Sequence, residues 1–250
     1  MARFISKAVS LKFMVGVGVL VTGILPHNVI LAQEPVRPLA IVQRFIPTVT
    51  LYSLDEDPVD LVPVEDQGEY LFDGDTLKTD AKGYALVKFT DNTIAKVKPE
   101  SILIVRGEER PNDRNINRRI DLEKGQIFLE VEPQGSGSFD VATTRSVASV
   151  KGTKFGATDL GYVWVREGQV DVTATNSGQT VSLFQQMFAS VDANGNNIET
   201  GALTEDEANN LEEGFDTLDE DLIERTILIR FRDANGQVRT VPVTIFEKGN

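Results

Sequence analysis

Cysteine is absent from this 250-residue chain, and histidine occurs once, at His27. Without cysteine the chain can form no disulfide bond, no thiolate metal site and no cysteine nucleophile. Beyond residue 27 there is no histidine either, so no Ser-His-Asp triad, Cys-His pair or imidazole metal site can be built there. These absences exclude most hydrolase chemistries. We therefore expect no catalytic, cofactor-binding or metal-binding residues.

Basic residues are scarce, because 25 Lys and Arg stand against 38 Asp and Glu and leave a net charge of −13. Such a surplus of negative charge repels phosphate backbones, so a nucleic-acid partner would need a local basic patch. The arginines of residues 107–119 are interspersed with Glu108, Glu109 and Asp113, which indicates a solvated loop instead. We expect no nucleic-acid partner.

The first 32 residues have the pattern of an export signal. Three basic residues and no acid precede the apolar run 13–25, Pro26 ends it, and Ala32 is a small residue suited to cleavage before Gln33. Cleavage would leave 218 residues with a net charge of −16, because three positive charges are lost. The alternative is an uncleaved anchor, although 13 apolar residues fall short of the roughly 20 that span a bilayer.

Short apolar and β-branched bursts fill residues 33–191 and predict an all-β domain. In the burst 84–89, alternation indicates one buried face and one partly wet face. Turn residues separate the bursts, among them Asp91-Asn92 and the hairpin-sized gap Glu167-Gly168-Gln169. The other bursts are Thr48–Tyr52, Ile102–Val105, Ile127–Val131, Val147–Val150, Val163–Val165, Val170–Thr173 and Thr180–Leu183.

Residues 192–224 are predicted to be an acidic linker with a short helix, because they hold twelve acids and no Lys or Arg. Thr204-Glu205-Asp206-Glu207 is a capping-box pattern, so we expect a helix from Glu205 to about Glu213 that ends at Gly214. The segment beginning at Asp192 resembles the start of a calcium loop. Asn197 and Leu203 stand where an EF-hand needs Gly and Glu, so an EF-hand is rejected, and weak divalent binding by the acidic run stays an alternative.

Residues 225–250 are predicted to form a C-terminal β-hairpin around the turn residues Asp233-Ala234-Asn235-Gly236. Two strands alone are marginal in water, so this hairpin must pair with the main sheet or with a partner. In the second case it would be an interaction module with an exposed edge, where Pro242 blunts one side.

Several short motifs follow one another within residues 70–191. Their order and spacing resemble those of the FecR-type extracytoplasmic domain, a family named for the iron-dicitrate sensor. The motifs are Gly74-Asp75-Thr76-Leu77-Lys78-Thr79, Gly83-Tyr84-Ala85, Phe89-Thr90-Asp91-Asn92-Thr93, Leu122-Glu123-Lys124-Gly125-Gln126-Ile127, Phe139-Asp140-Val141-Ala142-Thr143, Val150-Lys151-Gly152-Thr153-Lys154-Phe155 and 163–172.

The resemblance implies a twisted, solenoid-like or sandwich-like β-domain outside the cytoplasmic membrane, with a sensing or protein-contact role and no catalytic residues. The family's sensor proteins place a cytoplasmic segment that contacts a sigma factor before a single membrane span. Only 12 residues precede the apolar run here, too few for a folded module, so a transmembrane anti-sigma role is not the leading expectation.

The leading hypothesis is an exported, periplasmic or secreted, non-enzymatic protein that binds, senses or scaffolds without a cofactor. Its partner would be an unidentified envelope or secreted protein or polysaccharide, and it would contact the membrane only if residues 1–32 are retained. One alternative is a membrane-anchored, sigma-regulator-like signalling subunit. Another is a carboxylate-dependent carbohydrate-active enzyme, for which aromatic residues are scarce at 7% and Trp164 is the sole tryptophan, in a Val-rich strand that predicts core packing.

Overall fold

A computed structural model describes residues 37–54, 56–62, 65–107, 117–133, 137–218, 222–232 and 237–248. All of these residues belong to one of the chain's two compact units, Val36–Asn250. The predicted export signal, residues 1–32, lies outside the described residues and stays a prediction. No helix in the described ranges is both long and apolar enough to cross a membrane.

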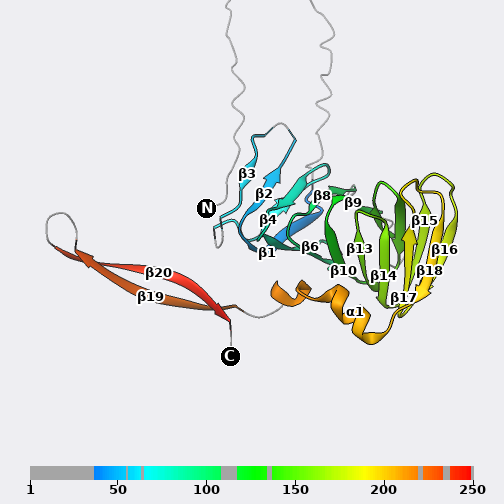
Figure 1. Cartoon of the computed structure of the whole chain (residues 1–250). Helices are drawn as coiled ribbons and strands as arrows, with labels where there is room; N and C mark the ends of the chain where they lie inside the picture. The colour runs from blue at the N-terminus through cyan, green and yellow to red at the C-terminus, as the bar shows by residue number, and fades with distance from the viewer. Residues whose placement is uncertain are drawn as a thin grey trace, which may run out of the picture. The chain divides into compact units, whose positions relative to one another are not determined.

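The described chain is built mainly of strands, which form two nine-stranded sheets and a separate hairpin (Figure 1). Sheet 1 has the strand order β18 (Ile198–Ala202), β17 (Met187–Val191), β14 (Tyr162–Glu167), β13 (Thr153–Thr158), β10 (Gln126–Val131), β7 (Ile94–Val97), β6 (Tyr84–Phe89), β1 (Ala40–Ile46) and β4 (Glu69–Leu71). Sheet 2 has the order β16 (Thr180–Phe184), β15 (Gln169–Ala174), β12 (Ser146–Val150), β11 (Phe139–Ala142), β9 (Arg118–Lys124), β8 (Ile102–Arg106), β5 (Thr76–Thr79), β2 (Val49–Tyr52) and β3 (Val59–Asp60).

Both sheets grow in the same direction as the chain proceeds, because β1 to β5 lie at one end of each and β16 to β18 at the other. The chain mostly adds one or two strands to one sheet and then crosses to the other. The registers described are antiparallel except between β9 and β11, which run parallel. This alternation makes the domain both solenoid-like and sandwich-like, which confirms the predicted all-β class.

One hydrophobic core lies between the sheets. In β6 the inward set Ala85, Val87 and Phe89 is buried, as the alternation predicts. The ring of Phe89 meets that of Phe139 in sheet 2 edge to face, with centroids 5.0 Å apart. Leu86, on the face predicted to be partly wet, is also buried, because a later segment of the chain covers that face near β6.

The predicted hairpin at Gly168 is wrong, because β14 and β15 belong to different sheets. Gly168 has φ +91° and turns the chain from one sheet to the other, and Gly125, with φ +94°, does the same between β9 and β10. Both glycines precede a glutamine, and both have a left-handed backbone that costs glycine little. They are sheet-crossing corners. Asn92, with φ 70°, occupies the predicted left-handed turn between β6 and β7.

The acidic segment contains more structure than its composition predicts. Its helix is confirmed: α1 spans Glu205–Glu212, and Thr204 and Glu207 form the expected capping box. Gly214 follows the helix with φ +85°. Strand β18 precedes the helix and pairs with β17, and the 3-10 helix η1 (Phe215–Leu218) follows it. Much of the segment is therefore part of the folded unit.

The C-terminal hairpin consists of two 11-residue strands, β19 (Leu222–Arg232) and β20 (Val238–Lys248). They pair antiparallel from Leu222 opposite Lys248 to Arg232 opposite Val238. Within the described ranges they form a sheet of their own and extend neither nine-stranded sheet. The predicted pairing with the main sheet is therefore not present among the described residues.

Candidate interaction surfaces

A row of residues crosses the outer face of sheet 1, with one residue from each of seven neighbouring strands. Successive register pairs place these residues opposite one another, so the row runs at right angles to the strands. Its inward neighbours Leu129 and Val165 lie in the core between the sheets. The row consists of Leu86, Lys96, Phe128, Gly156, Trp164, Phe188 and Gly201.

Residues 203–218, here called the strap, comprise Leu203, α1 and η1 and lie over this row. Leu203 and Phe215 of the strap form a second buried cluster with Phe128 and Trp164. The Phe215 ring stands 5.6 Å from that of Phe128, centroid to centroid. The Trp164 side chain is fully buried. The strap thus depends on apolar contacts with sheet 1, in addition to its own helical hydrogen bonds.

Cations of sheet 1 hold the strap at both ends of α1. Arg166 donates to Glu205 at 2.9 Å and to Asn209 at 3.2 Å. At the other end, the Lys98 ammonium and the Gln126 amide both donate to the Leu211 carbonyl, at 3.3 and 3.2 Å. A cation at a helix C-terminus is favoured by the unpaired carbonyls there.

Two further contacts continue this docking beyond α1. Lys98 also lies 4.4 Å above the Phe215 ring. At the end of the strap, Arg44 of β1 donates to the Leu218 carbonyl at 3.1 Å. The strap therefore follows sheet 1 from β18 to β1.

A pocket of about 310 Å³ opens between the strap and sheet 1. Burial raises the pKa of the Glu212 carboxyl, and the Arg166 guanidinium, 3.7 Å away, opposes that rise. Burial also lowers the pKa of the Lys98 ammonium, against the opposite influence of Glu213. The pocket is lined by Lys96, Phe128, Asn209, Glu212, Glu213, Gly214, Phe215 and Asp216.

We predict that acidification tightens the docking of the strap through Glu212. The pKa of Glu212 is higher in the folded protein than its ordinary value of 4.5. Its contribution to the stability of the docked strap is therefore complete below pH 4.5 and is lost as the pH rises through the raised pKa. Trp164 is the only tryptophan and lies under the strap, so its fluorescence in urea reports docking. The urea midpoint of wild type should be higher at pH 5 than at pH 7, and this difference should be larger than the same difference for Glu212→Gln. An identical pH dependence in the two proteins would contradict this prediction.

The sole tryptophan and the acidic turn at Asp192 have structural positions. Trp164 has the predicted core position, and its full burial leaves no indole face for a sugar. Within the described ranges, no three His, Cys, Asp or Glu side chains form a group that could hold a metal ion. The Asp192 carboxylate instead closes its own turn by accepting from the Asn196 N–H at 2.8 Å and from the Asn197 amide at 2.7 Å.

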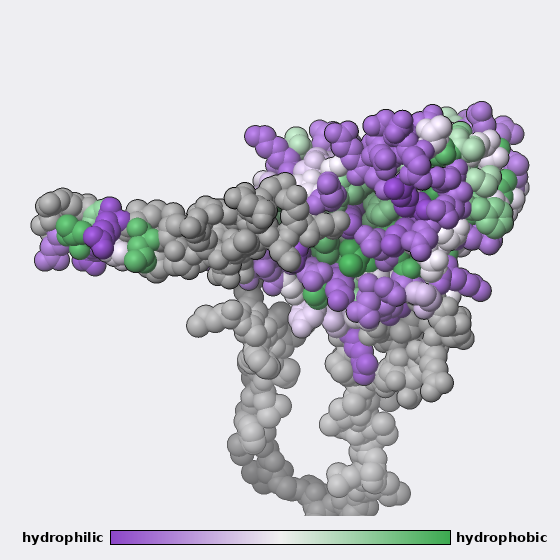
Figure 2. All heavy atoms as spheres, turned by 90° about the horizontal axis from the view of Figure 1, so that it is seen from below, coloured by the Kyte–Doolittle hydropathy of each residue, from purple (hydrophilic) through white to green (hydrophobic). Residues whose placement is uncertain are grey.

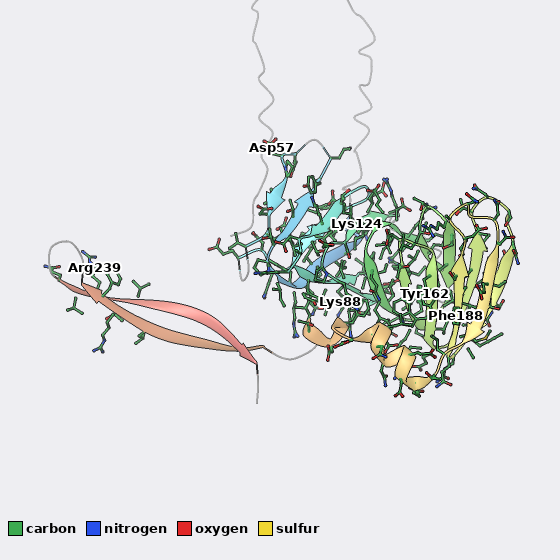
Figure 3. All side chains as sticks on the ribbon, viewed as in Figure 1. Asp57, Lys88, Lys124, Tyr162, Phe188 and Arg239 are labelled. Atoms are coloured by element: carbon green, nitrogen blue, oxygen red, sulfur yellow. The ribbon has the colours of Figure 1, made fainter. Side chains whose placement is uncertain are left out.

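A second candidate surface, here called the acidic end, is formed by residues 53–75 at the β3 and β4 edges of the two sheets. This stretch contains nine acids and no Lys or Arg. Asp57, labelled in Figure 3, is exposed, as are its neighbours Glu56 and Asp60. Apolar side chains are exposed among these acids as well, namely Leu54, Val59, Val62 and Tyr70.

The third candidate surface is the hairpin β19–β20, residues 222–248, here called the arm. Figure 2 shows hydrophobic residues on its described part, beside hydrophilic ones. Leu228 is 64% exposed and Val238 60% exposed, and Phe231 and Val241 are exposed as well. Large apolar side chains exposed on a two-stranded sheet are typical of a contact surface.

The sequence predicted the arm as a possible interaction module but identified neither the row under the strap nor the acidic end. The nine acids without a base are visible in the sequence and could have marked the acidic end. The row had no sequence signal of its own, because its members are far apart in the chain and two of them are glycines. Only the strand registers bring them together.

These surfaces belong to a sandwich-like domain of two nine-stranded sheets. Residues 75–171 match the family model described as FecR protein, so the chain contains a FecR-type domain over these residues. The match begins at the start of β5 and ends within β15. The strap, the arm and nearly all of the acidic end therefore lie outside it.

Two crystal structures of a candidate anti-sigma factor from Parabacteroides distasonis ATCC 8503, at 1.65 and 2.50 Å resolution, are similar to this chain. Each has 17% sequence identity, a TM-score of 0.47 and coverage of 56% of this chain. The chain spans 65% and 64% of their lengths, which is less than two thirds. A comparison with curated proteins finds no match.

Proposed function

We propose that this protein is an exported, non-enzymatic binding module whose arm makes the contact with a protein partner. The observation that carries the proposal is that β19 and β20 pair only with each other among the described residues. A two-stranded hairpin is marginally stable in water, so a third strand or a packed face would stabilise it. Edge strands present unpaired N–H and C=O groups to such a partner.

The FecR-type domain supports this proposal, because it supplies a packed scaffold that can carry the arm. The exposed apolar residues of the arm supply the contact area. An extracytoplasmic location, periplasmic or secreted, is part of the proposal and rests on the export-signal pattern of residues 1–32. A membrane-anchored signalling subunit is the second candidate, because the FecR-type domain and the apolar run 13–25 are both compatible with it.

Site-specific photocrosslinking in intact cells tests the role of the arm. A photoreactive amino acid replaces Leu228 on the arm or, as a matched control, Leu160 on the domain, which is 59% exposed. We expect a discrete protein adduct from position 228 and none from position 160. Equal labelling from both positions, or no adduct from position 228, would contradict the proposal.

The intact mass of the protein recovered from fractionated cells tests its location. Loss of residues 1–32 from protein in a soluble extracytoplasmic fraction is the result expected for the exported module. A full-length mass in the membrane fraction would favour the anchored signalling subunit instead. The crosslinking result still decides whether the arm makes the contact in that case.

A further inference from the structure

Charge is distributed unevenly along the chain, and residues 192–224, like residues 53–75, contain no Lys or Arg. The acidic end, residues 53–75, has nine acids and no base in its sequence, and one of the nine, Asp75, is buried. The arm, residues 222–248, has five bases and three acids, although the whole chain has a net charge of −13. The arm is therefore a basic element attached to an acidic protein, and its charge is complementary to that of the acidic end.

The acidic end leaves two sheet edges open. Strand β4 pairs with β1 on one side and β3 with β2 on one side, and each is the last strand of its sheet among the described residues. Both strands are short, at three and two residues. Leu54, 81% exposed, and Tyr70, 56% exposed, add apolar area beside these edges. The acidic end thus combines open backbone groups, apolar side chains and negative charge.

The arm presents the matching chemistry. Its register places Leu228 opposite Pro242, Arg230 opposite Thr240 and Phe231 opposite Arg239. Exposed apolar and basic side chains therefore occur on both strands, Leu228, Arg230 and Phe231 on β19 and Val238, Arg239 and Val241 on β20. Arg239, labelled in Figure 3, and Arg230 are both exposed. A surface of this kind fits an apolar surface rimmed by carboxylates better than it fits a second copy of itself, because two arms would bring like charges together.

We propose that the arm of one copy docks on the acidic end of a second copy of this chain. Among the described residues, β19 and β20 pair with neither β3 nor β4, so the outer edges of β3 and β4 receive no strand from the described part of their own chain. This inference rests on the proposed function, because it takes the arm as the contact element and names its partner. Each copy has one arm and one acidic end. The contact is therefore head-to-tail, and repetition gives rings or open chains.

The experiment measures the mass of the purified protein, in the form released by the cells, over a range of concentrations and salt. We expect the mass of wild type to rise with concentration, and less so at high salt, because salt screens exposed charges. Two double variants remove one surface each: Arg230→Glu with Arg239→Glu on the arm, and Glu56→Lys with Asp57→Lys on the acidic end. Each should weaken self-association by about 10-fold or more.

Mixing gives the sharpest result. Each variant alone presents like charges at its contact, but in an equimolar mixture the intact arm meets an intact acidic end and the changed arm meets a changed end of opposite charge, so the mixture should regain the association that each variant alone loses. A chain carrying both double changes should regain self-association, because the charges are exchanged between the surfaces. Lys151→Glu is the control on the domain and should associate like wild type. Near-UV and far-UV circular dichroism of every variant checks that it is folded.

Three outcomes would overturn the inference: a wild type that stays monomeric at all concentrations, self-association that neither double variant weakens, or crosslinks that join the arm to the acidic end of its own chain. A monomeric wild type whose position 228 still crosslinks to a different protein in cells would leave the proposed function standing. Loss of the cellular adduct from position 228 would overturn the proposed function and the inference together, because the inference takes the arm as the contact element. A failure of the inference alone is therefore distinguishable from a failure of both.

Discussion

Replacement of Trp164 by alanine is expected to lower the free energy of unfolding by about 3 to 5 kcal/mol, the range for large aromatic residues in protein cores. The side chain is fully buried between sheet 1 and the strap, where it belongs to the cluster of Phe128, Leu203 and Phe215. Its removal leaves a cavity that the two-sheet scaffold below cannot close. The cost therefore includes both lost burial and an unfilled volume.

Urea unfolding followed by far-UV circular dichroism measures this loss, because the variant has no tryptophan to report fluorescence. Phe184→Ala is the matched control, since this ring is 54% exposed at the end of β16 and should cost less than about 1 kcal/mol. The variant should also be cut by protease within residues 203–218 faster than wild type, because the strap loses its main apolar contact. A loss no larger than that of Phe184→Ala would show that the cluster does not hold the strap.

Much of the fold was predictable because local patterns determine strands. The burst Tyr84–Phe89 is β6 with its bounds unchanged, and Ile102–Val105 is β8 without its last residue. The helix was predictable for a similar reason, since the capping box at Thr204 lies within four consecutive residues. Strand β18 was not predicted, because an edge strand with exposed side chains lacks the alternation that marks buried strands.

The candidate surfaces were less predictable, because they depend on which strands become neighbours. Gly168 illustrates the difficulty: the sequence around it has the length of a hairpin turn, but the chain crosses to the other sheet there. The acid content of residues 192–224 predicted a solvated segment. Its apolar residues Leu203, Phe215 and Leu218 are buried instead. Composition averages over a segment, and packing depends on where its few apolar residues fall.

Replacement of Gly156 by alanine tests the same row from the opposite strand. Gly156 lies opposite Trp164 in the register of β13 and β14, and a Cβ atom there would stand 1.9 Å from Cζ2 of the indole ring. The ring is held from above by the strap and cannot move aside without cost. We expect Gly156→Ala to destabilise the fold by about 1 to 3 kcal/mol, the range for overpacked cores. Urea unfolding of the purified variant measures this change.

Gly201→Ala is the graded control, because a Cβ there would stand 2.5 Å from Phe188, whose ring is only partly buried and can move outward. It should cost less than Gly156→Ala. In the Trp164→Ala background, Gly156→Ala should cost almost nothing, since the added methyl group then enters the cavity left by the indole. The two substitutions would thus be strongly non-additive, as contacting residues are. Additive losses would mean that the glycine does not make room for the indole, and that strand register alone placed them together.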